Sequence, residues 1–394
     1  QICVGAGQCI TNGEFQIDAL AAAALNFDPK PRVAGLKGGG FVVVWGSANA
    51  ASDGSGSAVM ARLYGPDLAP TGAPFVVNEI LEGNQIEPAV DAATVGFGRF
   101  VVAWTTTDTP GSQGIAMRVY EADGTPVTGE IPVNQITLDN QSNAAVTMDE
   151  DGRFLVAWDD TDDVKTRYFE ADGTPEGDEF TLNTTLENNQ RDPEVAFLSD
   201  GGIAAAWTSL GVDTSGLAVV ALTLDATGLV DLPEMTVNEY VFNSQKNPAV
   251  VTLKEGDKVG WFAVLWESTS QASGDLSGVF MEIFNPLGVQ VGQGVDIPVH
   301  QNDVGAQAVP RGARLAGDRI VVVWESDDTD SSGTGIARRI FNASGGAVTN
   351  ELPVNQSITG NQVDPDVDAI DPTTFTVVWT NTQNGHIMGR ILNN

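Results

Sequence analysis

A strand-like apolar run that ends in tryptophan recurs along the whole chain and constrains its fold more than any other feature. Its seven copies have tryptophans that lie between 49 and 59 residues apart: Phe41–Trp45, Phe100–Trp104, Phe154–Trp158, Ile203–Trp207, Phe262–Trp266, Ile320–Trp324 and Phe375–Trp379. Self-similarity at a fixed period indicates a repeat architecture in which each copy is one supersecondary unit. No segment carries a long helical period, so the sequence predicts an all-β chain.

Each copy divides into four strand-like pieces separated by turn residues. In the sixth copy these are Pro310–Leu315, Ile320–Trp324, Gly335–Phe341 and Glu351–Asn355. Four short strands per repeat are typical of a β-propeller blade. We therefore predict a seven-bladed β-propeller of four-stranded blades over residues 14–394.

The two ends of the chain complement each other. The seventh copy stops after its third strand, His386–Leu392, whereas residues 14–18 resemble the fourth strand Glu351–Asn355. We expect residues 14–18 to complete the last blade, because this pairing removes the open edges that an unclosed array would expose. A linear solenoid is the alternative, but it would have no use for complementary half-repeats.

The connector between successive copies has a fixed length. A polar residue closes the fourth strand at Asn78, Asn134, Asn183, Asn238, His300 and Asn355, and a glutamine follows seven residues later at Gln85, Gln141, Gln190, Gln245, Gln307 and Gln362. Three residues after the glutamine comes a proline, or alanine in the third copy. Because this spacing does not vary, we expect the same crossing from the outer strand of one blade to the inner strand of the next.

Residues 1–13 lie outside the repeats and contain the only two cysteines, Cys3 and Cys9. Five residues separate them, which suits a small disulfide loop, whereas a metal site would need more Cys or His than the segment offers. A disulfide implies an oxidising compartment. Since the sequence begins at Gln1, we expect a mature, secreted protein of the extracellular space or cell surface whose signal peptide has been removed.

The charge balance excludes several classes of partner. The chain has 52 acidic and 19 basic residues and a net charge of −33. A surface this negative repels phosphate backbones and anionic lipid, so we expect no nucleic-acid binding. The apolar runs are far too short to span a bilayer, so we also expect no membrane insertion.

The repeats are similar to those of large secreted bacterial surface and RTX-type proteins. The residues that carry the resemblance are Ile320–Ser326, Ser331–Phe341 and Asn350–Asn355, and the likeness extends over residues 14–394. It implies a propeller-like fold and says little about activity, because propellers host many functions.

No catalytic constellation stands out. His300 replaces a strand-end asparagine and His386 opens a strand, which leaves little material for acid–base triads. A carboxylate pair could support glycoside hydrolysis, but 52 acidic residues make such pairs common by chance. The seven repeated tryptophans are better explained by burial between blades than by sugar stacking.

Two charged positions recur on the outer strands. Arg62, Arg118, Arg167, Arg339 and Arg390 occupy one position on the third strand, and Glu14, Glu130, Glu179, Glu234, Asp296 and Glu351 occupy one on the fourth. We expect ion pairs between them to link neighbouring blades. In the fifth copy Glu282 replaces the arginine and faces the strand of Asp296, and two carboxylates there repel unless a cation or partner intervenes.

The loop after the sixth tryptophan is the richest in carboxylates and is the candidate metal site. Asp327, Asp328 and Asp330 could bind Ca²⁺, since oxygen-rich loops with glycine turns suit that ion. No spacing matches an established calcium loop, and solvated turns are the alternative.

The fourth copy suggests self-association. Its third strand, Gly216–Leu224, lacks the arginine of the other copies, so we expect Leu217, Val219 and Val220 to form a partly exposed apolar face. Ile2, Val4 and Ile10 of the tail could cover this face on a neighbouring copy. A tighter packing of this blade against its neighbours is the alternative.

These features predict a non-enzymatic structural or adhesive propeller that binds itself, another extracellular surface protein or a glycan. A lectin-like propeller and, less favoured, a glycan-active hydrolase are the alternatives.

Overall fold

The computed structural model describes residues 2–4, 8–10, 13–18, 27–48, 56–107, 112–213, 216–271, 275–291, 294–302, 304–330 and 332–394. In these residues the protein is all-β, as predicted, with no helix. The described chain therefore has no helix long and apolar enough to cross a membrane.

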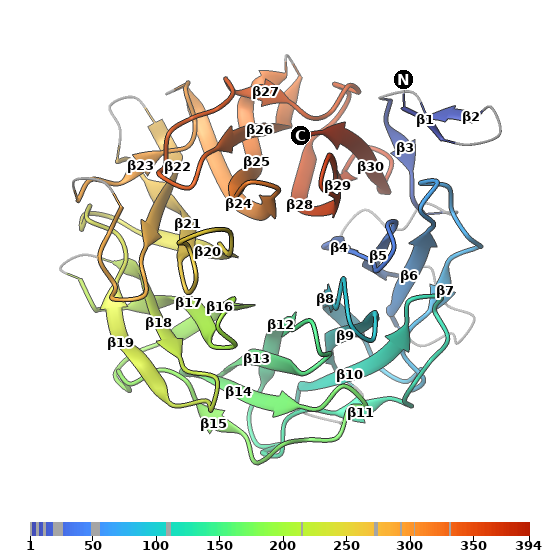
Figure 1. Cartoon of the computed structure of the whole chain (residues 1–394), viewed down its shortest axis with the longest axis horizontal. Coiled ribbons are helices and arrows are strands. Elements are labelled where there is room, and N and C mark those ends of the chain that lie inside the picture. Colours follow the sequence, from blue (N-terminus) through green and yellow to red (C-terminus); the bar gives the residue numbers. More distant parts are fainter. Residues whose placement is uncertain are drawn as a thin grey trace.

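The strands fall into four sets by their distance from the centre of the molecule (Figure 1). The innermost set is β4 (Arg32–Gly35), β8 (Gln85–Ala92), β12 (Gln141–Met148), β16 (Gln190–Phe197), β20 (Gln245–Thr252), β24 (Gly305–Leu315) and β28 (Gln362–Asp371). The second set carries the tryptophans: β5 (Phe41–Ser47), β9 (Arg99–Thr106), β13 (Phe154–Asp160), β17 (Ile203–Leu210), β21 (Phe262–Thr269), β25 (Arg319–Asp330) and β29 (Thr374–Asn381).

The outer two sets complete the sheets. The third set is β6 (Ala58–Tyr64), β10 (Gly114–Glu121), β14 (Asp163–Phe169), β18 (Leu217–Leu224), β22 (Asp275–Phe284), β26 (Gly333–Phe341) and β30 (His386–Asn393). The outermost set is β7 (Phe75–Val76), β11 (Ile131–Pro132), β15 (Phe180–Thr181), β19 (Val230–Thr236), β23 (Ile297–Pro298), β27 (Leu352–Pro353) and β3 (Phe15–Gln16).

Each repeat forms a four-stranded antiparallel sheet in which consecutive strands are neighbours. A short parallel contact between β22 and β24 joins the fifth and sixth sheets into one eight-stranded sheet. β3, from the start of the chain, pairs with β30 at its end through Phe15 with Gly389 and Gln16 with Met388. Figure 1 shows the sheets arranged around a common centre, with β3 from the start of the chain in the same sheet as β30 from its end.

Both faces of the tryptophan strands are buried, as the uninterrupted apolar runs require. All seven residues of β5 are buried, and so are all eight of β29. The seven repeated tryptophans are at most 2% exposed, which confirms that they pack between sheets.

The core is divided into clusters that each lie between two adjacent sheets. One cluster, for example, joins Val42 and Val44 of β5 to Phe100 and Trp104 of β9. Another joins residues of the last sheet, Ile370, Val378 and Ile387, to Val33 and Phe41 of the first. No sheet therefore has a core of its own, and each depends on its neighbours for burial.

The invariant connector residues satisfy buried polar groups at the strand ends. The side-chain oxygen of Asn78 accepts a hydrogen bond from the Val59 N–H at 3.0 Å. The indole N–H of Trp104 donates to Gln85 Oε1 at 3.0 Å, and Trp207, Trp324 and Trp379 bind Gln190, Gln307 and Gln362 in the same way. In these four repeats the connector glutamine and the buried tryptophan thus form a hydrogen-bonded pair.

The outer charged positions link neighbouring sheets through the backbone, which corrects the expected arginine–carboxylate pairing. Glu130 accepts a hydrogen bond from the Glu79 N–H of the preceding repeat at 2.7 Å, and Arg118 donates to the Val77 carbonyl at 3.0 Å. Arg118 also forms an ion pair with Glu79, at 2.6 Å.

The predicted tail lies beside β3 at the edge of the molecule (Figure 1). β1 (Ile2–Val4) and β2 (Gln8–Ile10) form a two-stranded hairpin in which Cys3 and Cys9 are register partners. The side chains of both strands lie outside the described residues, so the disulfide and the role of Ile2, Val4 and Ile10 stay predictions.

The hydrogen bond between tryptophan and glutamine gives a testable expectation. Trp207→Phe removes the donor to Gln190 Oε1, and both residues are fully buried. Since an orphaned buried acceptor costs about 1–3 kcal/mol, the free energy of unfolding should fall by that amount beyond the loss from the smaller ring. Trp158→Phe is the matched control, because the Trp158 indole N–H has no hydrogen-bond partner. Urea unfolding measures both, and equal losses would contradict the assignment.

Candidate functional site

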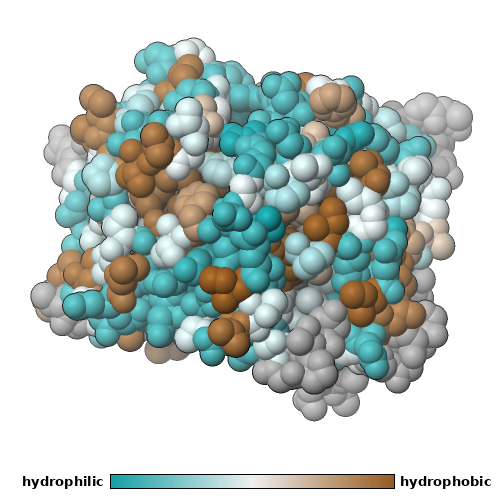
Figure 2. Space-filling model, turned by 90° about the horizontal axis from the view of Figure 1, so that it is seen from below, coloured by the Kyte–Doolittle hydropathy of each residue, from teal (hydrophilic) through white to brown (hydrophobic). Residues whose placement is uncertain are grey.

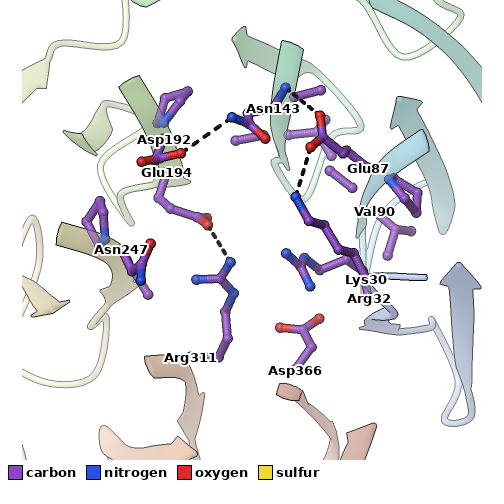
Figure 3. A pocket seen from close by; sticks show the side chains of 18 of the residues that line it. Lys30, Arg32, Glu87, Val90, Asn143, Asp192, Glu194, Asn247, Arg311 and Asp366 are labelled. Atoms are coloured by element: carbon purple, nitrogen blue, oxygen red, sulfur yellow. Dashed lines mark hydrogen bonds and ion pairs between the residues drawn. The ribbon is translucent and has the colours of Figure 1, made fainter. Parts of the chain in front are cut away.

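A cavity of about 320 Å³ opens where the inner strands begin, at the centre of the ring of sheets. Residues from all seven repeats line it, and Figure 3 shows polar and charged side chains from different strands converging on it. Its volume is at the lower end of the range of ligand pockets, about 300–1,000 Å³.

A larger hollow of about 960 Å³ lies further along the same inner strands and shares Val146, Val250 and Gly312 with the first. Its carboxylates serve the scaffold: Asp91 accepts a hydrogen bond from the Met148 N–H and Asp368 accepts one from the Gly35 N–H, each at 2.7 Å. The smaller pocket is therefore the better candidate site.

The backbone directs one residue of every repeat at the smaller pocket. The residue before the connector proline or alanine has a positive φ, between 42° and 55°, in every repeat: Lys30, Glu87, Asn143, Asp192, Asn247, Val309 and Asp364. In six of the repeats the inner strand has a register shift at this point, as between Ile86 and Ala89. Bulges of this kind redirect side chains next to functional sites.

The left-handed backbone is costly for most of these residues. Asn and Asp tolerate it, whereas Lys30, Glu87 and above all the β-branched Val309 do not. Such strain persists only where the surrounding structure enforces it, and it concentrates at active sites and ligand clamps. Here the backbone conformation is held in place by the connector, in which a buried glutamine lies two residues before the left-handed residue in six of the repeats.

Glu87 is held in the ionised form. Its Oε1 is 2.8 Å from Lys30 Nζ, and its Oε2 accepts hydrogen bonds from the Thr105 hydroxyl at 3.1 Å and the Asn143 N–H at 3.2 Å. Burial disfavours the charged form of Glu87 and would raise its pKa. The positive charge of Lys30 and the hydrogen-bond donors have the larger effect together, so the pKa of Glu87 is below its usual value.

Asp364 is in the opposite situation. Burial, followed by the charges of Asp28 and Glu325, raises the pKa of the Asp364 carboxyl to about 8. Glu325 is held in place by the Asp364 N–H, which donates to it at 2.8 Å, and burial raises the pKa of Glu325 to about 7. The raised pKa favours the protonated form of the Asp364 carboxyl at neutral pH.

The next residues along the inner strands form a charged layer beneath the rim. Arg311 Nη2 lies 3.4 Å from Glu194 Oε1 across the pocket, and Arg32 and Asp366 lie beside them (Figure 3). Burial raises the pKa of Glu194 and of Asp366 despite the attraction of the two arginines. Burial and the neighbouring Arg311 lower the pKa of Arg32.

In four repeats the residue after the buried tryptophan supports the rim from outside. Asp159, after Trp158, accepts hydrogen bonds from the Asn143 amide at 2.7 Å and from the Asp192 N–H at 2.8 Å. Burial raises the pKa of Asp159 to about 7, with added repulsion from Asp192. Neighbouring repeats are thus hydrogen-bonded to one another around the rim.

Solved structures share this fold across nearly all of the chain. A glycoside hydrolase family 93 α-L-arabinofuranosidase of Fusarium graminearum, solved with arabinobiose, is 10% identical, with a TM-score of 0.56, over 96% of this chain and 98% of that one. A family 25 polysaccharide lyase, an ulvan lyase bound to -[GlcA(1-4)Rha3S]-, is 11% identical, with a TM-score of 0.57, over 96% and 93%. A Penicillium chrysogenum α-L-arabinanase is 12% identical, with a TM-score of 0.52, over 78% and 93%.

No protein-family model and no curated protein matches the chain. The resemblance to secreted surface and RTX-type repeats therefore stays a prediction. The propeller-like fold that it implied is supported by the solved structures, although at these identities the likeness extends to the fold alone.

The comparison corrects the predicted function. A non-enzymatic structural or adhesive protein was expected, but three solved structures that share the fold are glycan-cleaving enzymes. The physical reason for the error is that the pocket carboxyls come from different repeats. Glu87 and Asp192, for example, are more than a hundred residues apart in the sequence, so their spacing does not reveal that they line the same pocket.

The predicted calcium loop is tied into local hydrogen bonds. Asp327 accepts one from the Thr334 hydroxyl at 2.9 Å, and Asp328 accepts one from the Gln307 amide at 3.4 Å. The side chain of Asp330 lies outside the described residues. Among the described side chains no group of three or more His, Cys, Asp or Glu could hold a metal ion, so Ca²⁺ at this loop stays a prediction.

The fourth repeat does not present the expected apolar face. Val219 and Val220 are fully buried and Leu217 is partly buried, because the sheets on either side cover both faces of β18. The tighter packing that was the alternative therefore describes these residues. Figure 2 shows one side of the molecule as mostly hydrophilic with scattered apolar groups. Self-association itself stays a prediction.

The sequence did contain one signal for the site. The position before the connector proline is ionisable or an amide in six of the seven repeats, whereas a purely structural position would vary more widely in chemistry. The constant spacing indicated a connector between repeats, but it did not indicate that the residue before the proline lines a pocket.

The Lys30–Glu87 pair predicts a pH-dependent loss of stability. Because the folded-state pKa of Glu87 is lowered, the pair stabilises the protein above the unfolded-state pKa, and this stabilisation is lost as pH falls through the folded value. Lys30→Met should reduce the free energy of unfolding by about 1 kcal/mol at pH 7, since both side chains are partly exposed. The difference should shrink below about pH 4.

Lys30→Arg is the control, because it keeps the positive charge and should stay close to wild type at both pH values. Urea unfolding at several pH values measures all three proteins. A deficit for Lys30→Met that does not change with pH would contradict the electrostatic origin.

Proposed function

We propose that the chain is a closed seven-bladed β-propeller whose central pocket is the active site of a secreted glycan-cleaving enzyme, most simply a glycoside hydrolase. The observation that carries the proposal is a pair of carboxyl groups on one pocket whose pKa values are displaced in opposite directions. The pKa of Glu87 is lowered, and the pKa of Asp364 is raised to about 8. Such divergence assigns acid and base roles in glycosidases.

The chemistry follows from the two protonation states. Glycoside hydrolysis needs one carboxylic acid to protonate the leaving oxygen and one carboxylate to attack the anomeric carbon or activate water. In this assignment Asp364 donates the proton and Glu87 supplies the carboxylate. Lys30 and the Asn143 N–H keep Glu87 ionised and oriented.

The amides on the rim suit a neutral sugar. Asn143 and Asn247 alternate with the charged residues around the pocket, and each donates from Nδ2 to a fixed carboxylate, Asp159 or Glu267. Their amide oxygens are held in place by these bonds and are suited to accept from sugar hydroxyls.

A second candidate reaction is polysaccharide elimination, for which the arginines are the supporting observation. Three of the 19 basic residues of this acidic chain, Lys30, Arg32 and Arg311, line the same small pocket. Cations placed there could neutralise the carboxylate of a uronic acid while Glu87 removes the neighbouring proton. This alternative predicts an unsaturated product.

The activity test uses a panel of arabinan, other neutral glycans and a glucuronate–rhamnose polymer. Glu87→Gln and Asp364→Asn should each lower kcat at least about 100-fold, because each removes a proton-transfer or nucleophilic group. Glu82→Gln, the same change at an exposed position three residues outside the connector glutamine, should leave kcat unchanged. Release of reducing ends measures cleavage, and ultraviolet absorbance of an unsaturated uronate distinguishes elimination from hydrolysis.

Stability provides the folding control. Because the folded-state pKa of Asp364 is raised, its ionisation opposes folding increasingly from its unfolded pKa up to about 8. Asp364→Asn should therefore be at least as stable as wild type at pH 7 while being inactive. Cleavage that survives both pocket substitutions would contradict the proposed site.

Closure of the ring has its own test. Deleting residues 1–18 removes β3 and the contacts of Glu14 with the Gln356 and Ser357 N–H groups, and leaves the β30 edge unpaired. The truncated protein should unfold at lower temperature and aggregate, since unpaired edges recruit other chains. Deleting only residues 1–12 is the control and should leave both properties unchanged. Equal behaviour of the two deletions, measured by thermal unfolding and light scattering, would argue against closure by β3.

A further inference from the structure

Five sheet junctions contain a fixed positive charge in the same place. Arginine on the third strand donates to a carbonyl oxygen of the preceding sheet: Arg62 to Ile17, Arg118 to Val77, Arg167 to Val133, Arg339 to Val299 and Arg390 to Val354. Four of these guanidinium groups also lie 5.1–5.7 Å from the centroid of an aromatic ring two residues further along the strand. At each of these five junctions a guanidinium cation therefore connects two neighbouring sheets.

The fifth sheet has a carboxylate at this position. Glu282 pairs with Val264, two residues before Trp266, and Arg118 pairs in the same register with Val102, two residues before Trp104. Glu282 is 1% exposed, so its side chain occupies the buried arginine position and does not turn out to solvent.

A second buried carboxylate shares this junction. Asp296 is 5% exposed and accepts hydrogen bonds from the Glu239 and Tyr240 N–H groups at 2.9 and 3.2 Å, as its counterparts do in other repeats. Burial, and then repulsion from Asp296 and Glu239, raises the pKa of Glu282 to about 8. The arginine that accompanies this acidic position in four other repeats is missing.

Two buried oxygen atoms at the junction have no hydrogen-bond partner. One is Glu282 Oε1, and the other is Oε1 of Gln271, whose Nε2 donates to Asp296 Oδ2 at 2.6 Å. A buried acceptor without a donor costs about 1–3 kcal/mol. Protonating Glu282 would relieve its repulsion with Asp296 but would leave the Gln271 oxygen without a donor.

We propose that a divalent cation of the oxygen-binding class, Ca²⁺, binds between Glu282 and Asp296 with the Gln271 amide oxygen, in the position that an arginine guanidinium occupies in five other repeats. Two carboxylates balance its charge, and Ca²⁺ accepts carboxylate, amide, carbonyl and water oxygens together. This site is separate from the Asp327 loop and from the pocket of Glu87. It links the fourth and fifth sheets as arginine links the others.

The test measures thermal unfolding of the full chain in EDTA, in CaCl₂ and in MgCl₂, together with calorimetric titration of Ca²⁺ alone. A ligand that binds only the native state raises Tm by mass action, so Ca²⁺ should raise the wild-type Tm above its value in EDTA. Glu282→Gln and Asp296→Asn should each weaken Ca²⁺ binding at least about tenfold. The double variant Asp327→Asn, Asp328→Asn is the matched control and should retain the response.

Glu282→Arg tests the replacement directly. It installs the residue of the other repeats, and its Tm should be the same in EDTA and in Ca²⁺ and at least equal to that of calcium-free wild type. The proposal is overturned by a wild-type Tm that does not respond to Ca²⁺. It is equally overturned by a response that Glu282→Gln retains or that only the Asp327 and Asp328 substitutions remove. None of these readouts depends on glycan cleavage, so this proposal and the enzymatic one fail separately.

Discussion

Every sheet of this protein has two apolar faces, and water can be excluded from them only by another sheet on each side. The tryptophan strands show this most clearly, since every residue of β5 and β29 is buried. The hydrophobic clusters lie between sheets, and one of them contains residues of both the first and the last repeat. The apolar pattern therefore demands neighbours for each repeat, including the two at the ends of the chain.

Because each sheet packs against a neighbour on both sides, the inner strands of all the repeats begin around one centre. Their first residues line the central pocket. In six of the seven repeats a connector glutamine is buried, and in four of these it accepts a hydrogen bond from the buried tryptophan. The residue two positions later is held in a left-handed conformation at the rim. The same scaffold repeated seven times places seven different side chains around one cavity. Variation at that single position, from Lys30 to Glu87 to Asp364, places on one pocket a carboxyl whose pKa is lowered and another whose pKa is raised. Strain that costs stability is thus concentrated where the chemistry is proposed.

The strong negative charge has several separate origins. Some carboxylates, such as Glu130 and Asp296, bind backbone N–H groups of the preceding repeat and so hold sheets together. Others, such as Asp91 and Asp368, fix neighbouring inner strands. Net charge alone consequently said little about function, because a large share of the acidic residues serves the scaffold. The exceptions are carboxyls such as Glu282, whose buried oxygen has no donor, and these point to a ligand.

The sequence by itself determined the repeat, its four strands, the all-β class and the burial of the tryptophans, because these depend on local apolar patterning and on spacing. The likeness between residues 14–18 and Glu351–Asn355 also anticipated the pairing of β3 with β30. Even the exceptional Glu282 was visible, since it interrupts a row of arginines.

Only the tertiary structure decided what those strands surround. The burial of Val219 and Val220 depends on sheets from other repeats, and the backbone partners of Arg118 and Glu130 lie in a preceding repeat. The pocket depends on seven left-handed residues, six of which lie at a bulge that sets the side-chain direction, and no local pattern of hydrophobicity records that direction.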